Sequence, residues 1–518
     1  MTRKKLPIGI QTFSEIRQEG HYYVDKTPLI LQLIDQGKYY FLSRPRRFGK
    51  SLLIDTIAEL FEGNRPLFEG LHAERHWDWS RRFPVLRISF AEGTLHSRAE
   101  LDQRIVLLLQ DNYERLGLQV PQGQDIAGLL GQLIRRAQVA SGQRVVVLVD
   151  EYDKPILDNI TEPDVARAMR EGLRNLYSVI KDEDAHIRFA MLTGVSKFSK
   201  VSLFSGLNNL NDITVDAHFS AICGYTDEDV DTVFAPELPG LDRDEIRRWY
   251  NGYNWTGKSV YNPFDLLLLF QEREFKPYWF ETGTPTFLVD LLAERQTFTP
   301  ELEQRISDMD LLSSFDVDHI ETDALLFQAG YLTLSKVEQI LPGEWLYTLG
   351  YPNQEVRTSL NKALLPRLGL SGSRGPQHRV QLLHCLRHND FAGLQALFTA
   401  FFASIPNDWY RSNRIANYEG YYASVFYSHF AALGLDIRCE DITNKGRIDM
   451  SVLFNGQVYL FEFKVVEDAP QGRALQQIRD KGYADKYRAR GEPVHLIGVE
   501  FSREERSVVG FEVETLSA

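Results

Sequence analysis

The stretch Tyr39-Tyr-Phe-Leu-Ser-Arg-Pro-Arg-Arg-Phe-Gly-Lys-Ser51 decides the fold of the first half of this chain. Its first five residues are an apolar run typical of a buried strand, and the run Leu52–Phe61 that follows is typical of a helix. A strand, a tight loop ending in Gly-Lys-Ser and a helix together predict a phosphate-binding loop. In such a loop, backbone N–H groups and the positive end of the helix dipole surround a polyphosphate.

The loop differs from the general pattern G-x-x-x-x-G-K-[ST] at its first position, where Arg44 replaces glycine, and Pro45 has no N–H to donate. We expect the Lys50 ammonium to reach the β and γ phosphates of a nucleotide and the Ser51 hydroxyl to bind Mg²⁺. The cofactor-binding residues predicted in the loop are Arg46, Arg47, Gly49, Lys50 and Ser51. For the two arginines of this set, the alternative to clamping phosphate is solvated loop charge.

A second element of the same predicted site is the strand Arg144–Asp150, which ends in the adjacent carboxylates Asp150 and Glu151. Open parallel sheets bind ligands at the carboxyl ends of their strands. We therefore expect Asp150 to complete the Mg²⁺ site and Glu151 to polarise the attacking water. The alternative is an ordinary strand-to-helix loop with acidic caps. The next strand ends at Thr193, which is either a sensor of the γ-phosphate or part of an ordinary strand exit.

The arrangement of apolar runs predicts the fold class. Short β-like runs alternate with helical runs up to about residue 290, which predicts an α/β domain with a parallel sheet covered by helices on both faces. Residues 291–375 read as helix-rich, with a short strand and turn, and favour a small winged-helix-like region. The glycines and proline of 371–376 are typical of a connector. We therefore expect three parts: 1–290, 291–375 and 376–518.

Four segments carry a resemblance to a known family: His21–Thr27, Phe41–Ser51, Leu148–Asp153 and Leu192–Phe198. Together they are similar to the prokaryotic AAA-ATPase-like proteins, and the resemblance extends over essentially the whole chain. It implies a P-loop NTPase fold that uses ATP and Mg²⁺ in the first part, and a PD-(D/E)xK nuclease-like α/β domain of the restriction-endonuclease type at the C-terminus. Arginine at the position of Arg44 is typical of that family's loop, so the missing glycine weighs less than the general pattern indicates.

The C-terminal part holds a second constellation, on the predicted strands 447–454 and 457–466. Asn455–Gly456 between two β runs is a strong signal for a two-residue hairpin turn. Counting back from that turn places Asp449 directly opposite Glu462. Like charges directly opposed across two strands are destabilising, so this register requires a counter-charge between the two carboxylates.

Lys464 supplies part of that counter-charge, because side chains alternate along a strand and Lys464 shares a face with Glu462. A divalent cation would supply the rest. An Asp followed by Glu-x-Lys on the next strand is the constellation of PD-(D/E)xK nucleases, in which the carboxylates hold Mg²⁺ and the lysine orients or activates the attacking water. We assign Asp449, Glu462 and Lys464 to catalysis, and the two carboxylates to metal binding. The alternative is a surface hairpin with solvated alternating charge.

Two flanking helical segments extend this second site. Stepping ~100° per residue puts Glu419 on an apolar stripe, where an unpaired carboxylate is costly, and we add it to the catalytic set. The segment 472–490 reads as one helix rich in Lys and Arg. The residues predicted to share a face of that helix and to contact the phosphates of nucleic acid are Gln477, Lys481 and Arg488. The family's pattern also has a glutamine at the position of Gln477.

Composition bounds the remaining possibilities. The chain has 518 residues, of which 43% are hydrophobic and 25% charged, with a formal net charge of −13. These values exclude a disordered chain and a basic nucleic-acid coat. No apolar run approaches the ~18–20 residues of a membrane-spanning helix. Cys223, Cys385 and Cys439 lie too far apart in sequence for a disulfide framework or a C-x-x-C site, so we expect a protein of the reducing cytoplasm.

The function expected from these patterns is an ATP-binding and ATP-hydrolysing protein coupled to a Mg²⁺-dependent nuclease that cleaves DNA or RNA. The alternative is a nucleotide-switched module that binds nucleic acid or protein without cleaving it. The sequence leaves open which nucleic acid is bound and whether copies of the chain assemble into a homo-oligomer.

Overall fold

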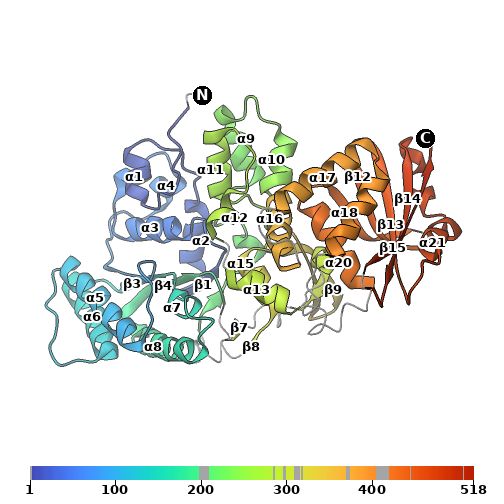
Figure 1. The fold of residues 1–518 in the computed structure, drawn as a ribbon. Coiled ribbons are helices and arrows are strands. Elements are labelled where there is room, and N and C mark those ends of the chain that lie inside the picture. Colours follow the sequence, from blue (N-terminus) through green and yellow to red (C-terminus); the bar gives the residue numbers. More distant parts are fainter. Residues whose placement is uncertain are drawn as a thin grey trace. The chain divides into compact units, whose positions relative to one another are not determined.

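The computed structural model describes residues 3–197, 209–283, 286–295, 299–308, 315–316, 319–368, 374–403, 419–443, 445–505 and 507–517. The chain forms two compact units (Figure 1). The N-terminal unit comprises Met1–Gly283 and Arg305–Asn353, and the C-terminal unit comprises Thr284–Gln304 and Gln354–Ala518. The region expected at 291–375 is therefore divided between the two units, and the three-part division stays a prediction.

The N-terminal unit is built on a five-stranded parallel sheet with the order β2-β3-β4-β1-β5. The strands are β1 (Tyr39–Ser43), β2 (Val85–Ser89), β3 (Val145–Asp150), β4 (Ile187–Gly194) and β5 (Asn211–Asp212). Every residue of β1 and β3 is buried, as expected for strands covered on both faces. In Figure 1, α3 (Lys50–Phe61) lies on one side of the sheet and α8 (Pro163–Asp182) on the other. The predicted α/β fold is confirmed.

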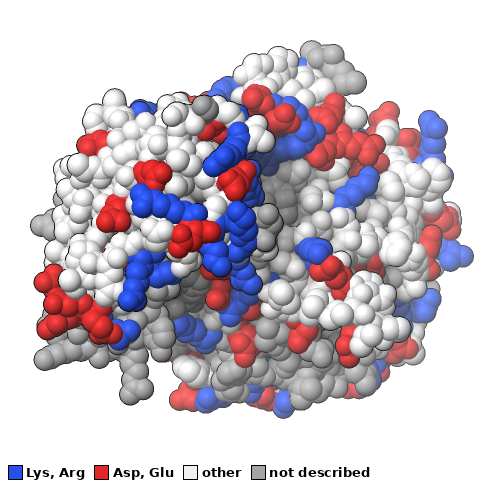
Figure 2. Space-filling model, turned by 90° about the vertical axis from the view of Figure 1, so that its right-hand side faces the viewer, with Lys and Arg blue, Asp and Glu red and all other residues white. Residues whose placement is uncertain are grey.

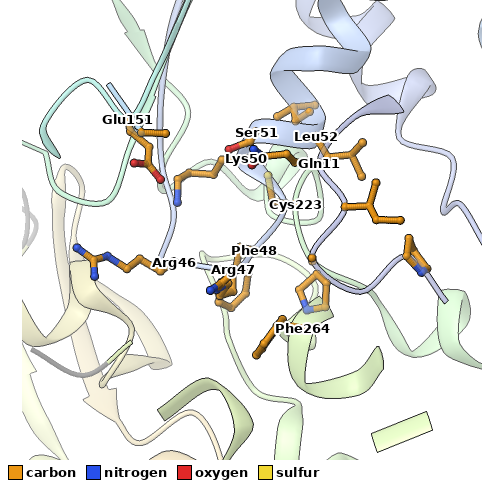
Figure 3. A pocket seen from close by; sticks show the side chains of 18 of the residues that line it. Gln11, Arg46, Arg47, Phe48, Lys50, Ser51, Leu52, Glu151, Cys223 and Phe264 are labelled. Atoms are coloured by element: carbon orange, nitrogen blue, oxygen red, sulfur yellow. The ribbon is translucent and has the colours of Figure 1, made fainter. Parts of the chain in front are cut away.

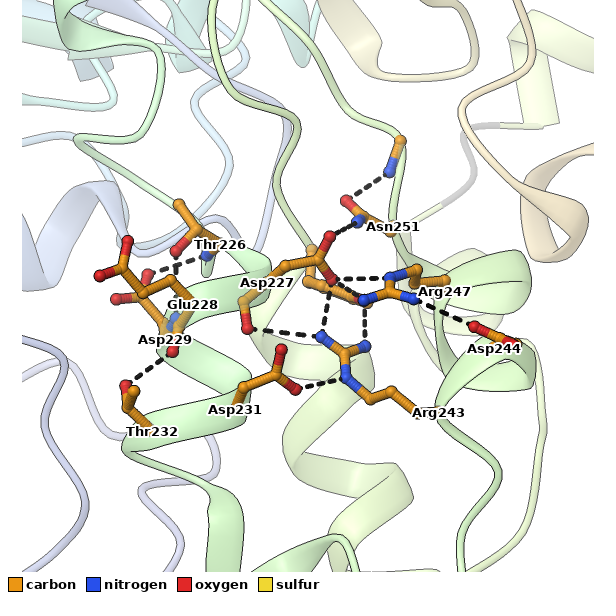
Figure 4. Close-up of polar contacts among 12 residues, drawn as sticks. Thr226, Asp227, Glu228, Asp229, Asp231, Thr232, Arg243, Asp244, Arg247 and Asn251 are labelled. Carbon is orange, nitrogen blue, oxygen red and sulfur yellow. Dashed lines mark hydrogen bonds and ion pairs between the residues drawn. The ribbon is translucent and has the colours of Figure 1, made fainter.

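The segment that follows β5 is helical and is held together by charged contacts. Thr226 and Asp229 form a capping box that begins α9 (Asp227–Thr232). The Asp227 carboxylate accepts hydrogen bonds from Arg243 at 2.6 Å and Arg247 at 3.2 Å, which joins α9 to α10 (Arg243–Tyr250) (Figure 4). The other helices of the unit are α1 (Phe13–Gln18), α2 (Thr27–Gln36), α4 (His72–His76), α5 (Arg98–Arg115), α6 (Ile126–Ser141), α7 (Lys154–Leu157), α9 (Asp227–Thr232), α10 (Arg243–Tyr250), α11 (Pro263–Glu272) and α12 (Tyr278–Gly283).

Residues 305–353 add a small antiparallel sheet, in the order β6-β10-β9, to the same unit. Its elements are β6 (Arg305–Ser307), α15 (Thr322–Ala329), β9 (Thr333–Leu341) and β10 (Glu344–Gly350), with the short pair β7 (Phe315–Asp316) and β8 (His319–Ile320). Gly330 ends α15 with a φ of 90°, and a Cβ at this glycine would lie 2.6 Å from Pro45 Cγ. The absence of a side chain therefore lets this helix end pack directly on the loop between β1 and α3.

The C-terminal unit contains a mixed sheet with the order β11-β12-β13-β14-β15. The strands are β11 (Asp436–Thr443), β12 (Gly446–Phe454), β13 (Gln457–Val466), β14 (Val494–Ser502) and β15 (Val508–Leu516). β13 and β14 are parallel, and the other neighbours are antiparallel. β12 and β13 are the two strands predicted from the sequence at 447–454 and 457–466. The helices are α13 (Thr286–Glu294), α16 (Gln354–Leu364), α17 (Arg374–His388), α18 (Phe391–Ala403), α20 (Glu419–Ala431) and α21 (Arg473–Lys481).

The prediction of one continuous helix over 472–490 is wrong. α21 ends at Lys481, because Gly482 adopts a left-handed backbone with a φ of 56°. Two short 3₁₀ turns follow, η8 (Tyr483–Lys486) and η9 (Arg488–Arg490). This path buries Tyr483 and Tyr487 against the sheet in the same core cluster as Ile448 and Leu460.

Candidate active sites

The loop between β1 and α3 borders a cavity of about 560 Å³ in the N-terminal unit. The lining includes all five loop residues predicted from the sequence, together with Glu151: Arg46, Arg47, Gly49, Lys50 and Ser51. The side chains of Lys50 and Glu151 extend toward each other, and Ser51 lies beside them at the start of α3 (Figure 3). The fold thus brings the predicted loop and the end of β3 to one cavity.

Lys50 is buried, and its ammonium is bonded to the loop that carries it. Nζ donates to the carbonyl oxygens of Arg44 at 2.9 Å and Pro45 at 3.0 Å. Burial lowers the pKa of Lys50, and the nearby carboxylates of Asp150 and Glu151 oppose that shift. The ammonium therefore has two neutral acceptors that anionic oxygens of a ligand can replace with stronger charge-assisted bonds.

Arg44 occupies the place of the first glycine of the general loop pattern, and it points into the protein. Its guanidinium is fully buried and donates to the carbonyl oxygens of Ser43 and Thr214, both at 2.8 Å, and of Phe219 at 3.3 Å. It also lies over the Trp255 ring at 3.9 Å from the centroid. Burial lowers the pKa of Arg44 to about 10. Arg44 thus anchors the loop from behind and is not among the residues that line the cavity.

Arg46 and Arg47 lie in the exposed part of the loop. Arg47 has a left-handed backbone with a φ of 69°, and its guanidinium lies over the Phe264 ring at 4.8 Å from the centroid. Trp279 Nε1 donates to the backbone oxygen of Arg46 at 3.1 Å. Both side chains border the cavity, so the placement leaves phosphate clamping and solvated charge open.

Asp150 and Glu151 end β3 in different environments. Asp150 is buried, and its Oδ1 accepts hydrogen bonds from Thr193 Oγ1 at 2.7 Å and from the Glu151 backbone N–H at 3.1 Å. Thr193 is fully buried and absent from the cavity lining, so its side chain orients Asp150. Glu151 has a left-handed backbone with a φ of 51°, and burial raises the pKa of its carboxyl while Lys50 opposes the rise.

Asp153 is a residue of this site whose role the sequence patterns missed. Its carboxylate is buried and accepts hydrogen bonds from Ser196 N and Ser196 Oγ, both at 2.6 Å, and from Val195 N at 3.1 Å. Burial raises the pKa of this carboxyl. Asp153 therefore ties the segment after β3 to the end of β4. The signal was a third carboxylate in the run Asp150–Asp153.

In the C-terminal unit, the hairpin between β12 and β13 has the predicted register. Phe454 faces Gln457, and Met450 faces Phe461. Asn455 and Gly456 have φ values of 52° and 70°, which are typical of a two-residue hairpin turn. The prediction from the Asn-Gly pair is therefore confirmed.

This register brings Asp449 and Glu462 together. Phe463 N donates to Asp449 Oδ2 at 2.8 Å, so the Asp449 carboxylate reaches the backbone next to Glu462. Glu462 is fully buried; its Oε1 accepts a hydrogen bond from Gln477 Nε2 and lies 3.4 Å from Lys464 Nζ. Among the described residues, Glu462 Oε2 has no hydrogen-bond partner.

Burial is the main cause that raises the pKa of Glu462 to about 8. The charge of Asp449 adds to the rise, and Lys464 opposes it. The Glu462 carboxyl therefore gives up its proton less readily than an exposed glutamate. A buried carboxyl with one unpartnered oxygen beside a second carboxylate fits an oxygen-binding divalent cation, because such a cation can replace the proton and satisfy that oxygen.

Glu419 begins α20, but its side chain lies outside the described residues. α20 packs on the sheet through Phe426, whose ring lies 5.0 Å from that of Phe463, on the face opposite to Glu462 since neighbouring side chains alternate. In the part of the chain that the structure describes, no three or more His, Cys, Asp or Glu side chains form a group able to hold a metal ion. A role of Glu419 beside Asp449 stays a prediction.

The three predicted nucleic-acid-binding residues do not share one helix face, because α21 ends at Lys481. Gln477 is directed at Glu462, and Lys481 is exposed at the end of the helix. Arg488 lies in η9, with its Nε 3.1 Å from Asp485 Oδ1. On the face drawn in Figure 2, Lys and Arg gather in one band, and elsewhere acidic and basic side chains are interspersed. Contact with nucleic acid at these residues stays a prediction.

Comparison with known proteins matches a family model to a segment in each of the two units. Residues 7–204 match the model of the AAA-ATPase-like family, described as "Predicted AAA-ATPase", and residues 417–511 match that of the PD-(D/E)XK nuclease superfamily. An Azotobacter chroococcum mcd 1 protein, described as "Uncharacterized protein in vnfD 5'region", is 68% identical over 517 residues, which is 100% of both chains.

A solved structure, that of the Aeropyrum pernix ORC1 protein in complex with DNA, covers 67% of this chain and 95% of that chain at 14% identity. The TM-score is 0.25, which supports no conclusion about fold or partner. Within the described ranges, none of the helices combines the length and the apolar character that crossing a membrane requires.

Proposed function

Because this chain belongs to the AAA-ATPase-like proteins that carry a C-terminal domain of the PD-(D/E)XK nuclease superfamily, we propose that it binds and hydrolyses ATP and cleaves nucleic acid in a Mg²⁺-dependent reaction. The observation that carries the nuclease proposal is the buried Glu462, with one unpartnered oxygen, set beside Asp449 and Lys464.

In the N-terminal unit, the cavity beside Lys50 takes the triphosphate. Lys50 exchanges the carbonyl oxygens of Arg44 and Pro45 for phosphate oxygens. Ser51 and Asp150 hold the Mg²⁺ that accompanies the nucleotide, with Asp150 kept in place by Thr193. Glu151 faces Lys50 and orients the attacking water.

In the C-terminal unit, Asp449 and Glu462 hold a divalent cation through carboxylate oxygens. A cation bound there lowers the pKa of a water ligand and polarises the scissile phosphate. Gln477 keeps Glu462 oriented through its hydrogen bond. The Lys464 ammonium, 3.4 Å from Glu462 Oε1, orients the attacking water and balances the local negative charge.

Nucleic acid is the substrate class that this chemistry fits, and exposed Lys481 lies on the helix that carries Gln477. The setting we propose is the cytoplasm, since all three cysteines are free thiols. Whether copies of the chain assemble into a homo-oligomer is a separate question.

One observation favours a second function, a nucleotide-switched module that binds nucleic acid without cutting. Among the described residues, no third His, Cys, Asp or Glu side chain joins Asp449 and Glu462, and the Glu419 side chain lies outside those residues.

Incubation of plasmid, single-stranded DNA and RNA with Mg²⁺, with and without ATP, distinguishes the two functions. We expect the wild-type chain to cleave at least one of these substrates and Asp449→Ala to cleave none. The matched control Asp441→Asn replaces a carboxylate on β11 of the same sheet, which accepts hydrogen bonds from Ser451 and Tyr487, and this variant should retain cleavage. Binding without cleavage in every nucleotide state supports the module instead.

A further inference from the structure

A buried carboxylate on β14, Glu500, caps the N-terminus of α21. Glu500 Oε1 accepts hydrogen bonds from the backbone N–H groups of Arg473 at 2.6 Å and Ala474 at 3.3 Å. Its Oε2 accepts from Gly472 N at 3.1 Å and from Gln471 N. The first amides of a helix have no partner within the helix, and the residue before α21, Gly472, has no side chain to cap it. Glu500, which lies on a strand distant in sequence from α21, thus caps the helix in place of a side chain at residue 472.

The sheet is shaped to let this contact form. Gly498 and Glu500 lie two residues apart on β14 and therefore on one face. A Cβ at Gly498 would lie 2.3 Å from the backbone nitrogen of Leu475, so only glycine lets α21 approach the strand this closely. On the neighbouring strand β15, Gly510 is the register partner of Glu500, and a Cβ at Gly510 would lie 3.1 Å from Glu500 Cβ. Two glycines thus leave room for the helix and for the carboxylate that holds it.

The helix end held by Glu500 lies beside the carboxylate site. In the parallel pairing of β13 with β14, Glu462 is the register partner of Gly498, and Lys464 is the partner of Glu500. The Gln477 side chain leaves α21 one turn after the amides bound by Glu500 and donates to Glu462 Oε1. The position of the α21 N-terminus therefore fixes where Gln477 meets Glu462.

We propose that Glu500 is a positioning residue of the C-terminal site: it docks the N-terminus of α21 on the sheet and thereby sets Gln477 against Glu462. Because a ligand such as Glu462 binds a metal best when its second oxygen is held by a neighbour, the loss of either Glu500 or Gln477 weakens cation binding at Asp449 and Glu462. This role rests on the proposed metal-dependent function of that site.

The test uses the full chain and Mn²⁺ as the probe. Calorimetric titration locates the C-terminal site as the Mn²⁺ site that Asp449→Ala removes. Glu500→Gln and Gln477→Ala should each weaken Mn²⁺ binding there by about tenfold or more. The double variant should be no weaker than the weaker single variant, because both act through the same contact. The control Glu514→Gln should leave the affinity unchanged, because it removes a half-buried carboxylate of β15 whose Oε2 lies 2.5 Å from Arg479 Nε of α21, away from Glu500 and Gln477.

Hydrogen exchange separates the two steps of the proposal. Glu500→Gln should accelerate exchange at the amides of 471–476. Gln477→Ala should not, because the Gln477 side chain bonds Glu462 and none of those amides. Wild-type exchange in Glu500→Gln overturns the capping role, and additive losses of Mn²⁺ affinity overturn the route through Gln477. If Glu500→Gln fails to fold, Glu500→Asp keeps the charge with a shorter reach and should give smaller changes of the same kind.

Failure of the proposed function is distinguishable from failure of this inference. A wild-type chain without any Mn²⁺ site that depends on Asp449 contradicts the metal-dependent function. Exchange at 471–476 and a crystal structure of Glu500→Gln then decide the inference, which is wrong if Gln477 still contacts Glu462 in that variant.

Discussion

The backbone N–H of Phe463 donates a hydrogen bond of 2.8 Å to Asp449 Oδ2. This contact fixes the carboxylate of β12 against β13 at the position of Glu462, whose buried carboxyl has a pKa raised to about 8 by burial and by Asp449. The two acids are therefore held together by the backbone and not by mutual attraction, which is the arrangement that a shared cation stabilises.

The first prediction concerns pH and metal. A carboxyl whose pKa rises on folding, here from 4.5 to about 8, stabilises the fold fully below its ordinary pKa, and that contribution is lost as the pH rises through about 8. With EDTA, the unfolding temperature of the C-terminal unit should fall between about pH 5 and about pH 9. Mg²⁺ should restore it at the alkaline end, and Glu462→Gln should lose both effects. Differential scanning fluorimetry measures this, and a pH slope that persists in Glu462→Gln counts against the assignment.

The second prediction concerns the N-terminal cavity. Lys50→Ala should abolish ATP binding, because it removes the ammonium that the loop between β1 and α3 presents to the cavity. Glu151→Gln should bind ATP but not hydrolyse it, because the amide keeps the shape and cannot accept a proton. Binding of a fluorescent ATP analogue and release of phosphate measure the two steps. Normal turnover in both variants contradicts the ATPase proposal.

The third prediction tests Arg44. Arg44→Gly restores the general loop pattern, yet it should lower the free energy of unfolding by about 2–4 kcal/mol, since three buried carbonyl oxygens lose a charged donor. Arg46→Ala, at an exposed neighbour, should change it by less than about 0.5 kcal/mol. Chemical denaturation compares the two variants. An Arg44→Gly chain as stable as the wild type shows that the anchor is dispensable.

The fourth prediction separates Lys481 from Arg488. Lys481 is exposed, so Lys481→Ala should weaken nucleic-acid binding and reduce the slope of log affinity against log salt by about 1. Arg488→Ala should change that slope less, because Asp485 already neutralises part of its charge. Fluorescence anisotropy at several salt concentrations measures both slopes. Equal slopes in Lys481→Ala and the wild type remove α21 from the contact surface.

Local sequence signals predicted the elements whose geometry is set within a few residues. The Asn455–Gly456 pair fixed the hairpin register, because such a turn admits one pairing of the strands that flank it. The loop before α3 was found in the same way, from a strand, Gly-Lys-Ser and a helix. Both signals lie in short contiguous stretches.

The sequence did not reveal contacts between distant segments. Arg44 lies 170 residues from Thr214, and Glu500 lies 27 residues from Arg473, so no spacing rule links either pair. The helix over 472–490 was predicted too long because the charge pattern continues past Gly482, whereas the burial of Tyr483 and Tyr487 favours a break there. Tertiary packing overrode the local pattern at that point.

Locating the bound metal in the C-terminal unit tests the proposed site most sharply. Fe²⁺ with ascorbate and peroxide generates radicals that cut the polypeptide beside bound iron, and mass spectrometry maps the cuts. If Asp449 and Glu462 hold the cation, cuts occur in β12 near Asp449 and in β13 near Glu462; excess Mg²⁺ suppresses them and Asp449→Ala abolishes them. A wild-type chain with no cuts in either strand, or with cuts that persist in Asp449→Ala, contradicts the proposed site.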